Sequence, residues 1–347
     1  MTTAAAVTPG GEDFRTLTDP FRAELLAYCY RMLGSVHEAE DQVQETLIRA
    51  WRSYGSFQGD ASLRTWLYRI ATNTCLRALE TRSRRPLPSG LGGPGDDALI
   101  EPSAGRPEFP WLQPIPDSLF GAQPADPAAV VVSRQSMRLA LIAALQYLPA
   151  RQRAVLILRD VLGWRAAETA ELVGTTTTAV NSVLQRARER LAQAAPAEDD
   201  IREPTDAARR ELVDRYASAF ENADVAALTA LLREDATLEM PPQLAWLAGR
   251  EPVTRFVARW VLSEPGRFRI VAAAANGQPA LAAYLRDQDG VFRAHGIQVL
   301  TVSAAGIARI VAFNDPALFD SFALPPAIIS GGSWPARPAR PGWAIRG

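Results

Sequence analysis

The chain has 347 residues, 48% of them hydrophobic, and a formal net charge of −1 at pH 7. This length predicts two or three domains rather than one core. The sequence contains arginine but no lysine, so a high arginine content is a weak sign of phosphate binding. Its two cysteines are too few for a secreted disulfide scaffold. Because the sequence shows neither a signal peptide nor an apolar run of membrane-spanning length, we expect a cytoplasmic protein with no membrane partner.

Residues 1–12 are a small-residue tail that we expect to be disordered, and helical patterning covers residues 13–86. Within this block, Glu38–Tyr54 reads EAEDQVQETLIRAWRSY. Its apolar residues recur at the spacing of one buried helical face, namely Ala39, Val43, Leu47, Ala50 and Trp51. The other face is polar and carries Glu38, Asp41, Gln44, Glu45 and Arg52. That face is either solvated or built to contact another protein.

A second helix follows the break at Gly55–Ala61 and reads SLRTWLYRIATNTCLRALETRSRR. We expect its buried side to hold Leu63, Trp66, Leu67, Ile70 and Thr74, with Arg64, Tyr68, Asn73 and Arg77 elsewhere. Aromatic and basic residues beside a polar loop suit single-stranded nucleic acid, whose bases can stack or enter a pocket. Burial of all the aromatic residues in the core explains the pattern equally well.

Residues 87–129 are rich in proline, glycine and acidic residues, which argues against a packed element. A segment of this length between helical blocks predicts a linker or a functional strap. Trp111 and Leu112 are its candidates for docking onto another surface.

Helical patterning resumes over residues 130–195 and includes LGWRAAETAELVGTTTTAVNSVLQRARERL. One helix is expected from about Arg165 to Val173, followed by Gly174 where a helix end needs positive φ. Thr176 or Thr177 can cap the next helix. That helix is expected to bury Val180, Leu184, Ala187 and Leu191.

The outer face of this last helix is polar and carries Asn181, Ser182, Gln185, Arg186, Arg188 and Arg190. A short helix, a glycine turn and a longer helix with such a face form a helix-turn-helix layout. Asn and Gln can read adenine edges in the major groove, and arginines can hold phosphates. The alternative is an ordinary helical hairpin with a solvated arginine face.

In combination, the two blocks closely resemble extracytoplasmic-function, or group 4, sigma factors of bacterial RNA polymerase. The resemblance covers region 2 and region 4 of that family, at about residues 14–85 and 134–194. It implies core RNA polymerase and promoter DNA as partners, and makes the polar EDQVQET face a polymerase-binding surface with Asp41, Gln44 and Glu45 as candidates. For the −10 element it implies Gln58, Ser62, Arg64 and Asn73. For the −35 element it implies Asn181, Ser182, Gln185, Arg186 and Arg188.

The same resemblance implies that the acidic linker passes through the polymerase toward its RNA exit path, although a merely solvated linker fits the composition equally well. Such factors also have separate anti-sigma partners in many cases, and the sequence does not identify one here.

A short joint precedes residues 205–323, where two predicted helices are followed by five β-like runs, ending before a Pro/Gly-rich flexible tail at 324–347. Helices followed by consecutive strands predict an α+β domain. The pattern resembles the SnoaL-like fold, a curved sheet around a conical pocket. The fold class is therefore multidomain, with two all-α domains (the region 2 bundle and the region 4 helix-turn-helix) and a C-terminal α+β SnoaL-like conical-sheet domain.

Enzymes occur on the SnoaL-like fold, and catalysis there would need a poised acid or base inside the cone. The candidate lining is Tyr216, Trp246, His295, Gln298, Asn314 and Asp315. His295 can equally be structural, so we expect no enzyme, no catalytic residue, no metal and no cofactor, and a small apolar ligand as a candidate partner.

The expected function is a sigma factor directing promoter-specific initiation, with the C-terminal domain modulating it. A stand-alone helix-turn-helix regulator with a ligand-binding domain is the alternative. Turnover of a small substrate by the C-terminal domain would indicate a third class, an enzyme with a sigma-like scaffold.

Overall fold

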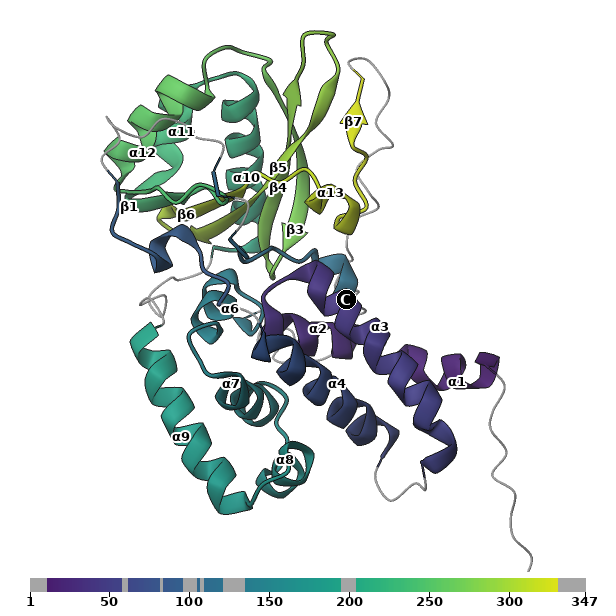
Figure 1. Cartoon of the computed structure of the whole chain (residues 1–347). Coiled ribbons are helices and arrows are strands. Elements are labelled where there is room, and N and C mark those ends of the chain that lie inside the picture. Colours follow the sequence, from purple (N-terminus) through teal and green to yellow (C-terminus); the bar gives the residue numbers. More distant parts are fainter. Residues whose placement is uncertain are drawn as a thin grey trace, which may run out of the picture. The chain divides into compact units, whose positions relative to one another are not determined.

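The computed structural model describes residues 11–57, 62–81, 84–95, 105–106, 109–120, 135–194 and 204–329. Contacts within the chain define two compact units (Figure 1). Unit 1 comprises Met1–Pro86 and Leu119–Glu198, and unit 2 comprises Leu87–Ser118 and Asp199–Gly347. Leu87–Ser118, here called the linker segment, thus groups with the C-terminal domain. None of the described helices is long and apolar enough to cross a membrane.

Unit 1 is helical. Its N-terminal part contains α1 (Gly11–Thr18), η1 (Asp19–Phe21), α2 (Arg22–Leu33), α3 (Val36–Ser53), η2 (Tyr54–Ser56) and α4 (Leu63–Glu80). Its second part contains α6 (Leu139–Leu145), α7 (Ala150–Leu156), the π-helical turn η5 (Ile157–Val161), α8 (Ala166–Val173) and α9 (Thr177–Ala194). Helices α2, α3 and α4 pack against one another.

The buried face of α3 is rotated from the one that we predicted. It carries Val36, Ala39, Val43, Thr46 and Ala50. Trp51, predicted to be buried, is 38% exposed, because its ring meets Phe14 of α1 edge-on at the helix end instead of entering the core. In α4, Tyr68 was predicted to lie away from the buried side, but it is fully buried. Trp66 was predicted to be buried, but it is only partly buried.

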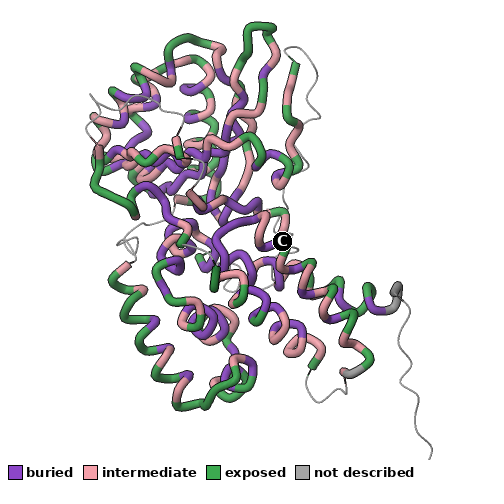
Figure 2. The backbone as a smooth tube through the Cα atoms, in the orientation of Figure 1, coloured by how far each residue is buried: buried purple, intermediate pink, exposed green. Residues whose placement is uncertain are grey.

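The helix-turn-helix prediction is confirmed in detail. Helix α8 ends at Gly174, whose φ of 68° is the left-handed conformation that favours glycine. The Thr176 hydroxyl accepts a hydrogen bond from the Ala179 amide and caps α9. Val180, Leu184 and Ala187 are buried, Leu191 is only partly buried, and most of the remaining helix is exposed (Figure 2).

Unit 2 is an α+β domain. Its helices are α10 (Asp206–Glu221), α11 (Val225–Leu231), α12 (Arg250–Phe256), the π-helical turn η6 (Val257–Val261) and α13 (Leu318–Ser321). Its strands are β1 (Leu232–Glu239), β2 (Trp246–Ala248), β3 (Phe268–Ala275), β4 (Gln278–Arg286), β5 (Phe292–Ser303), β6 (Gly306–Phe313) and β7 (Ala327–Ile328). The linker segment contributes η3 (Pro88–Gly90), and η4 (Asp117–Phe120) begins at its end. The five predicted strands are present, whereas β2 and α12 were not predicted.

The sheet has the strand order β2-β1-β6-β5-β4-β3, and β7 pairs with β5. Only the β1–β6 pair is parallel among the described strand pairs. Strands β3 and β4 are joined by a two-residue turn at Asn276 and Gly277, with φ values of 57° and 67°. Asn-Gly is the pair that this hairpin turn favours, because both positions need positive φ.

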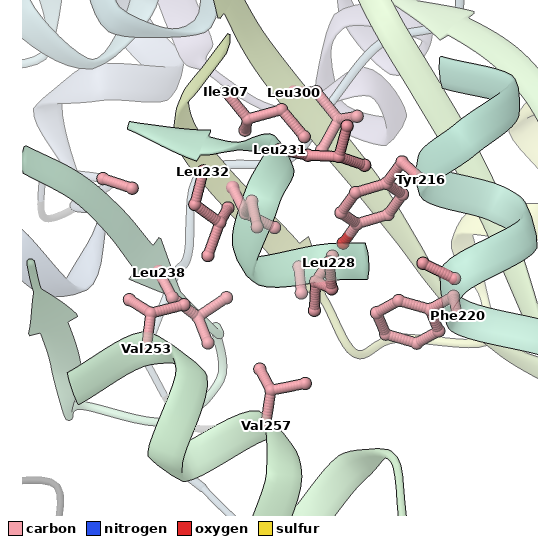
Figure 3. Packing of buried hydrophobic residues seen from close by; sticks show 14 of the residues in the cluster. Tyr216, Phe220, Leu228, Leu231, Leu232, Leu238, Val253, Val257, Leu300 and Ile307 are labelled. Carbon is pink, nitrogen blue, oxygen red and sulfur yellow. The ribbon is translucent and has the colours of Figure 1, made fainter. Parts of the chain in front are cut away.

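The core of unit 2 lies between the sheet and helices α10, α11 and α12. Figure 3 shows side chains from these helices, including Tyr216, Phe220 and Val253, packed with Leu300 and Ile307 of the sheet. Buried aliphatic and aromatic side chains occupy the space between these helices and the sheet. Burying each large apolar side chain contributes about 1.5–3 kcal/mol to stability.

The ends of the predicted segments differ slightly from the expectation. Helix α1 begins at Gly11, within the predicted N-terminal tail, and residues 1–10 lie outside the described residues. At the other end, β7 falls inside the predicted flexible tail, where it pairs with β5. The Tyr284 hydroxyl donates to the Pro325 carbonyl nearby, so this part of the predicted tail belongs to the sheet domain.

Candidate functional site

The outer face of α3 carries the predicted protein-binding residues. Asp41 and Gln44 are exposed, and Glu45 is half-buried, with Oε1 2.5 Å from Nε of Arg49. The Ser35 hydroxyl accepts the Glu38 amide and fixes the start of the helix. The acidic and amide groups therefore share one solvent-facing side.

Sequence reasoning missed the apolar part of this surface. Ile48 and Trp51, both on α3, are 37% and 38% exposed. Leu17 of α1 is also exposed. An apolar patch beside carboxylates has the composition of a protein interface, in which an aromatic anchor is flanked by polar groups.

The predicted −10 residues are only partly brought together. Gln58 lies outside the described residues. Ser62 begins α4, and its hydroxyl accepts the Thr65 amide. Asn73 is exposed on the same side of α4 as Ser62, but about 16 Å further along at 1.5 Å per residue. Nine residues separate Arg64 from Asn73, which places them on opposite sides of the helix.

Arg64 is held by its neighbours. Its Nε donates to both carboxylate oxygens of Glu24, at 3.0 and 3.1 Å. The guanidinium lies 5.1 Å from the centre of the Tyr68 ring and 5.5 Å from that of Trp164. These contacts fix a cation at the start of α4, and 40% of its side chain stays exposed.

Three of the five predicted −35 residues share one exposed surface, the outer side of α9. Asn181, Gln185 and Arg188 line a shallow depression that also includes Arg159. Arg188 donates to both carboxylate oxygens of Asp160, at 2.8 and 2.6 Å, which orients its guanidinium. The arrangement has hydrogen-bonding amides toward the start of the helix and cations toward its end.

Two further residues of the predicted set, Ser182 and Arg186, lie on the neighbouring side of α9. The Ser182 hydroxyl donates to the Thr178 carbonyl, and Arg186 donates to the Ser182 carbonyl at 3.3 Å. Both side chains therefore bond to carbonyls of their own helix.

In unit 2, the linker segment is bound by the sheet domain. The Ser89 amide donates to Oε2 of Glu239 at 2.9 Å. Nε1 of Trp246 donates to the Gly92 carbonyl at 2.9 Å, and the Gly95 amide donates back to the Trp246 carbonyl at 2.8 Å. Trp246, predicted to line a pocket, therefore binds the linker segment through its side chain and its backbone carbonyl.

The β3–β4 turn holds the other end of the linker segment. The Ile115 amide donates to Oδ1 of Asn276 at 3.1 Å, and the Asn276 amide donates back to the Ile115 carbonyl at 3.0 Å. The Gly277 amide donates to Oδ1 of Asp117 at 2.8 Å. These residues of the sheet domain (Glu239, Pro242, Trp246, Asn276 and Gly277) are called the linker dock below.

Apolar burial accompanies these hydrogen bonds. Leu112 and Ile115 are completely buried, and Trp111 is 9% exposed, which confirms that Trp111 and Leu112 dock. The Arg106 amide donates to the Pro242 carbonyl, and its own carbonyl accepts Nε1 of Trp111. The described residues of the segment are irregular yet packed, and the linker dock binds several of their backbone polar groups.

The other predicted pocket residues do not form a catalytic pair. The Tyr216 hydroxyl donates to Oε1 of Gln298 at 2.9 Å inside the core. His295 lies beside Phe268, and burial together with nearby Arg267 lowers the pKa of its imidazole.

Asn314 and Asp315 follow β6. The Asn314 amide donates to the Pro241 carbonyl, and Oδ1 of Asp315 accepts the Ala317 amide at an exposed turn. Among the described residues, no hydrogen bond or ion pair joins His295 to Asp315, the pair that an acid-base mechanism would have used.

Comparison with known proteins gives a consistent assignment for all three segments. Family models match Sigma-70 region 2 at residues 17–85, Sigma-70 region 4 at residues 138–191 and a SnoaL-like domain at residues 213–312. The ECF RNA polymerase sigma factor SigG of Mycobacterium tuberculosis (strain ATCC 25618 / H37Rv) is 49% identical over 321 residues, covering 91% of this chain and 85% of that protein.

A second relative extends the similarity to a solved structure. ECF RNA polymerase sigma factor SigJ of the same strain is 28% identical over 316 residues, covering 88% of this chain and 91% of that protein. The crystal structure of M. tuberculosis SigJ matches with a TM-score of 0.57 and 24% identity, covering 89% of this chain and 99% of that chain. The structural match shows a shared fold.

Proposed function

Because this chain belongs to the extracytoplasmic-function RNA polymerase sigma factors, we propose that its C-terminal domain restrains promoter use by holding the linker between regions 2 and 4. Sigma factors bind core RNA polymerase and promoter DNA and direct promoter-specific initiation, and they are not enzymes. The observation behind the proposal is the binding of the linker segment by the linker dock.

The length of the linker segment gives this binding a physical consequence. Leu87–Ser118 connects region 2 to region 4, and fully extended it would span about 110 Å at about 3.3–3.6 Å per residue. While it stays docked, the two regions cannot use that length to move apart. Docking on the C-terminal domain therefore competes with any state in which the linker is extended, including one threaded through the polymerase.

The surfaces that meet the partners follow from the exposed faces of unit 1. Asp41, Gln44 and Glu45, together with Ile48 and Trp51, form the proposed surface for core polymerase. Carboxylates and an amide can make charge-assisted contacts with a basic partner, while the two apolar residues supply burial.

The proposed DNA contacts lie on α4 with its preceding loop and on α9. They are Gln58, Ser62, Arg64 and Asn73 for the −10 element, and Asn181, Ser182, Gln185, Arg186 and Arg188 for the −35 element. We place this activity in the cytoplasm, where the polymerase works. A small apolar ligand of the sheet domain stays a prediction.

Transcription from a cognate promoter tests the restraint. Core polymerase is supplied with the full chain, with an Asn276→Gly variant that weakens the linker dock, or with a chain ending at residue 200. A Val253→Ala variant, altered in a buried part of the domain that does not bond to the linker segment, controls for general destabilisation. We expect more promoter-specific product with Asn276→Gly than with Val253→Ala. Unchanged output and unchanged promoter choice in both the Gly variant and the shortened chain would contradict the proposal.

A further inference from the structure

A carboxylate lies on the face of α9 that is proposed to bind DNA. Glu189 is exposed, stands one helical turn after Gln185, and is the only acidic residue among the described residues of α9. It lines the same shallow depression as Asn181, Gln185 and Arg188. Because its negative charge repels phosphates, any gain that Glu189 brings to DNA recognition has to come through a neighbouring side chain.

That neighbour is Gln185. Nε2 of Gln185 donates to Oε1 of Glu189 at 3.1 Å. An ionised carboxylate accepts hydrogen bonds and donates none, so the amide can meet it only with its nitrogen. The carbonyl oxygen Oε1 of Gln185 is bonded to the same carbon as Nε2 and therefore points away from Glu189. Among the described residues, Oε1 of Gln185 forms no hydrogen bond, which leaves it as an acceptor on the exposed face.

The other polar side chains of this face differ from Gln185. Arg188 is also oriented by a carboxylate, that of Asp160, but a guanidinium offers donors and no acceptor. Asn181 is exposed, and no residue of the described part of the chain forms a hydrogen bond with its side chain, so its amide can present either the nitrogen or the oxygen. Of these two amides, Gln185 is the one held with its acceptor outward.

The orientation of an amide decides which base it can read in the major groove. Adenine and cytosine each present an amino group there, at N6 and N4, which donates a hydrogen bond. Guanine and thymine present carbonyl oxygens instead, O6 and O4, which only accept. An outward carbonyl oxygen accepts from the first pair of bases and repels the second. An amide that is free to turn over can satisfy either pair.

We propose that Glu189 is a positioning residue that holds Gln185 with Oε1 outward, so that Gln185 reads a base with an amino group, adenine or cytosine, in the −35 element. The inference rests on the proposed −35 role of α9. It adds the kind of base that is read at one position, and it gives a function to a residue outside the predicted DNA-contact set.

Selection from a randomised promoter tests the proposal. Core RNA polymerase carrying the full chain is incubated with a cognate promoter whose −35 element is randomised, and the bound DNA is sequenced. Comparison with Gln185→Ala identifies the position that Gln185 reads. In the parent we expect adenine and cytosine together to be enriched over guanine and thymine at this position by about three- to tenfold, the range for one hydrogen bond. Gln185→Ala should reduce this ratio to within about twofold of one.

Glu189→Gln separates positioning from charge. The new amide can donate as well as accept, so Gln185 can turn over, and the base ratio at its position should fall toward one. Removal of the negative charge should also strengthen binding to all sequences alike. If Glu189 acted through its charge alone, total binding would rise and the ratio would stay at the parent value, which would overturn the proposal.

Two comparisons serve as controls. In Gln185→Ala/Glu189→Gln the ratio should equal that of Gln185→Ala, because no amide is left to orient. The position read by Asn181, found with Asn181→Ala, should keep its base preference in Glu189→Gln. Loss of preference at both positions in Glu189→Gln would show a general disturbance of α9 and overturn the positioning role. A parent preference for guanine or thymine at the Gln185 position would overturn the assigned orientation.

Failure of the proposed function would look different. A parent chain with no base preference anywhere in the −35 element would overturn the −35 role of α9 and this inference with it. A −35 preference that Asn181→Ala alters, but that Gln185→Ala leaves intact at every position, would overturn the inference alone.

Discussion

Replacing Asn276 with glycine measures how much the Asn276 side chain contributes to binding of the linker segment by the linker dock. Asn276 adopts a φ of 57°, which glycine also adopts without strain, so the β3–β4 turn should be retained. The change removes Oδ1, the acceptor for the Ile115 amide, while the hydrogen bond from the residue 276 amide to the Ile115 carbonyl can persist. The perturbation is therefore confined to the dock and leaves the linker sequence unchanged.

The expected loss of binding free energy follows from the burial of the hydrogen bond between Ile115 and Asn276. Ile115 and Asn276 are both completely buried, so the Ile115 amide loses its acceptor in a place that water does not easily reach. An unsatisfied buried amide costs about 1–3 kcal/mol. Because 1.4 kcal/mol corresponds to about a tenfold change in an equilibrium constant, release of the segment should become about 5- to 150-fold more frequent.

Hydrogen exchange of the amides around Ile115 measures that release. Their exchange should accelerate by the same factor when closing is fast compared with exchange. Amides of β4, such as that of Leu281, serve as an internal reference and should stay at the parent rate. The reasoning is refuted if the Ile115 amide exchanges at the parent rate in Asn276→Gly, or if the β4 amides accelerate equally, because the whole domain would then be opening.

Three other predictions concern the partner surfaces and the sheet domain. Asp41→Arg/Glu45→Arg should abolish pull-down of core RNA polymerase by reversing the charge of the α3 surface, and undiminished binding would remove this face from the interface. Arg188→Ala should weaken promoter binding by a similar factor on all sequences and reduce the slope of log affinity against log salt by about 1, as titrations at several salt concentrations would show. The pKa of His295 lies below its ordinary value of 6.5, so the unfolded chain binds the proton more readily. The contribution of neutral, buried His295 to the free energy of unfolding of the sheet domain should therefore be complete above pH 6.5 and decrease as the pH is lowered toward the folded pKa. In denaturant titrations, His295→Asn should flatten this pH dependence.

Local sequence signals predicted the elements that local interactions determine. Gly174, the Thr176 cap and the buried residues of α9 form one continuous stretch, and each is fixed by neighbours within a few residues. The five strand runs were also predicted, since β-forming character is a property of short stretches of sequence.

The errors occurred where distant residues decide burial. Helical spacing placed Tyr68 outside the predicted buried side of α4, but Trp164, 96 positions later in the numbering, packs on its ring. Trp51 fits the apolar periodicity of α3, yet its partner is Phe14 at the edge of the bundle. Helical spacing identifies a face but does not show what covers it.

The linker segment is the clearest case of such long-range determination. Its proline and glycine content predicts no regular element, and in the described part of the segment this holds apart from short 3-10 turns. Composition could not show that the backbone polar groups would find partners on a domain encoded more than a hundred residues later. Trp111 and Leu112 were the only signal, since large apolar residues in a polar stretch need a surface to cover them.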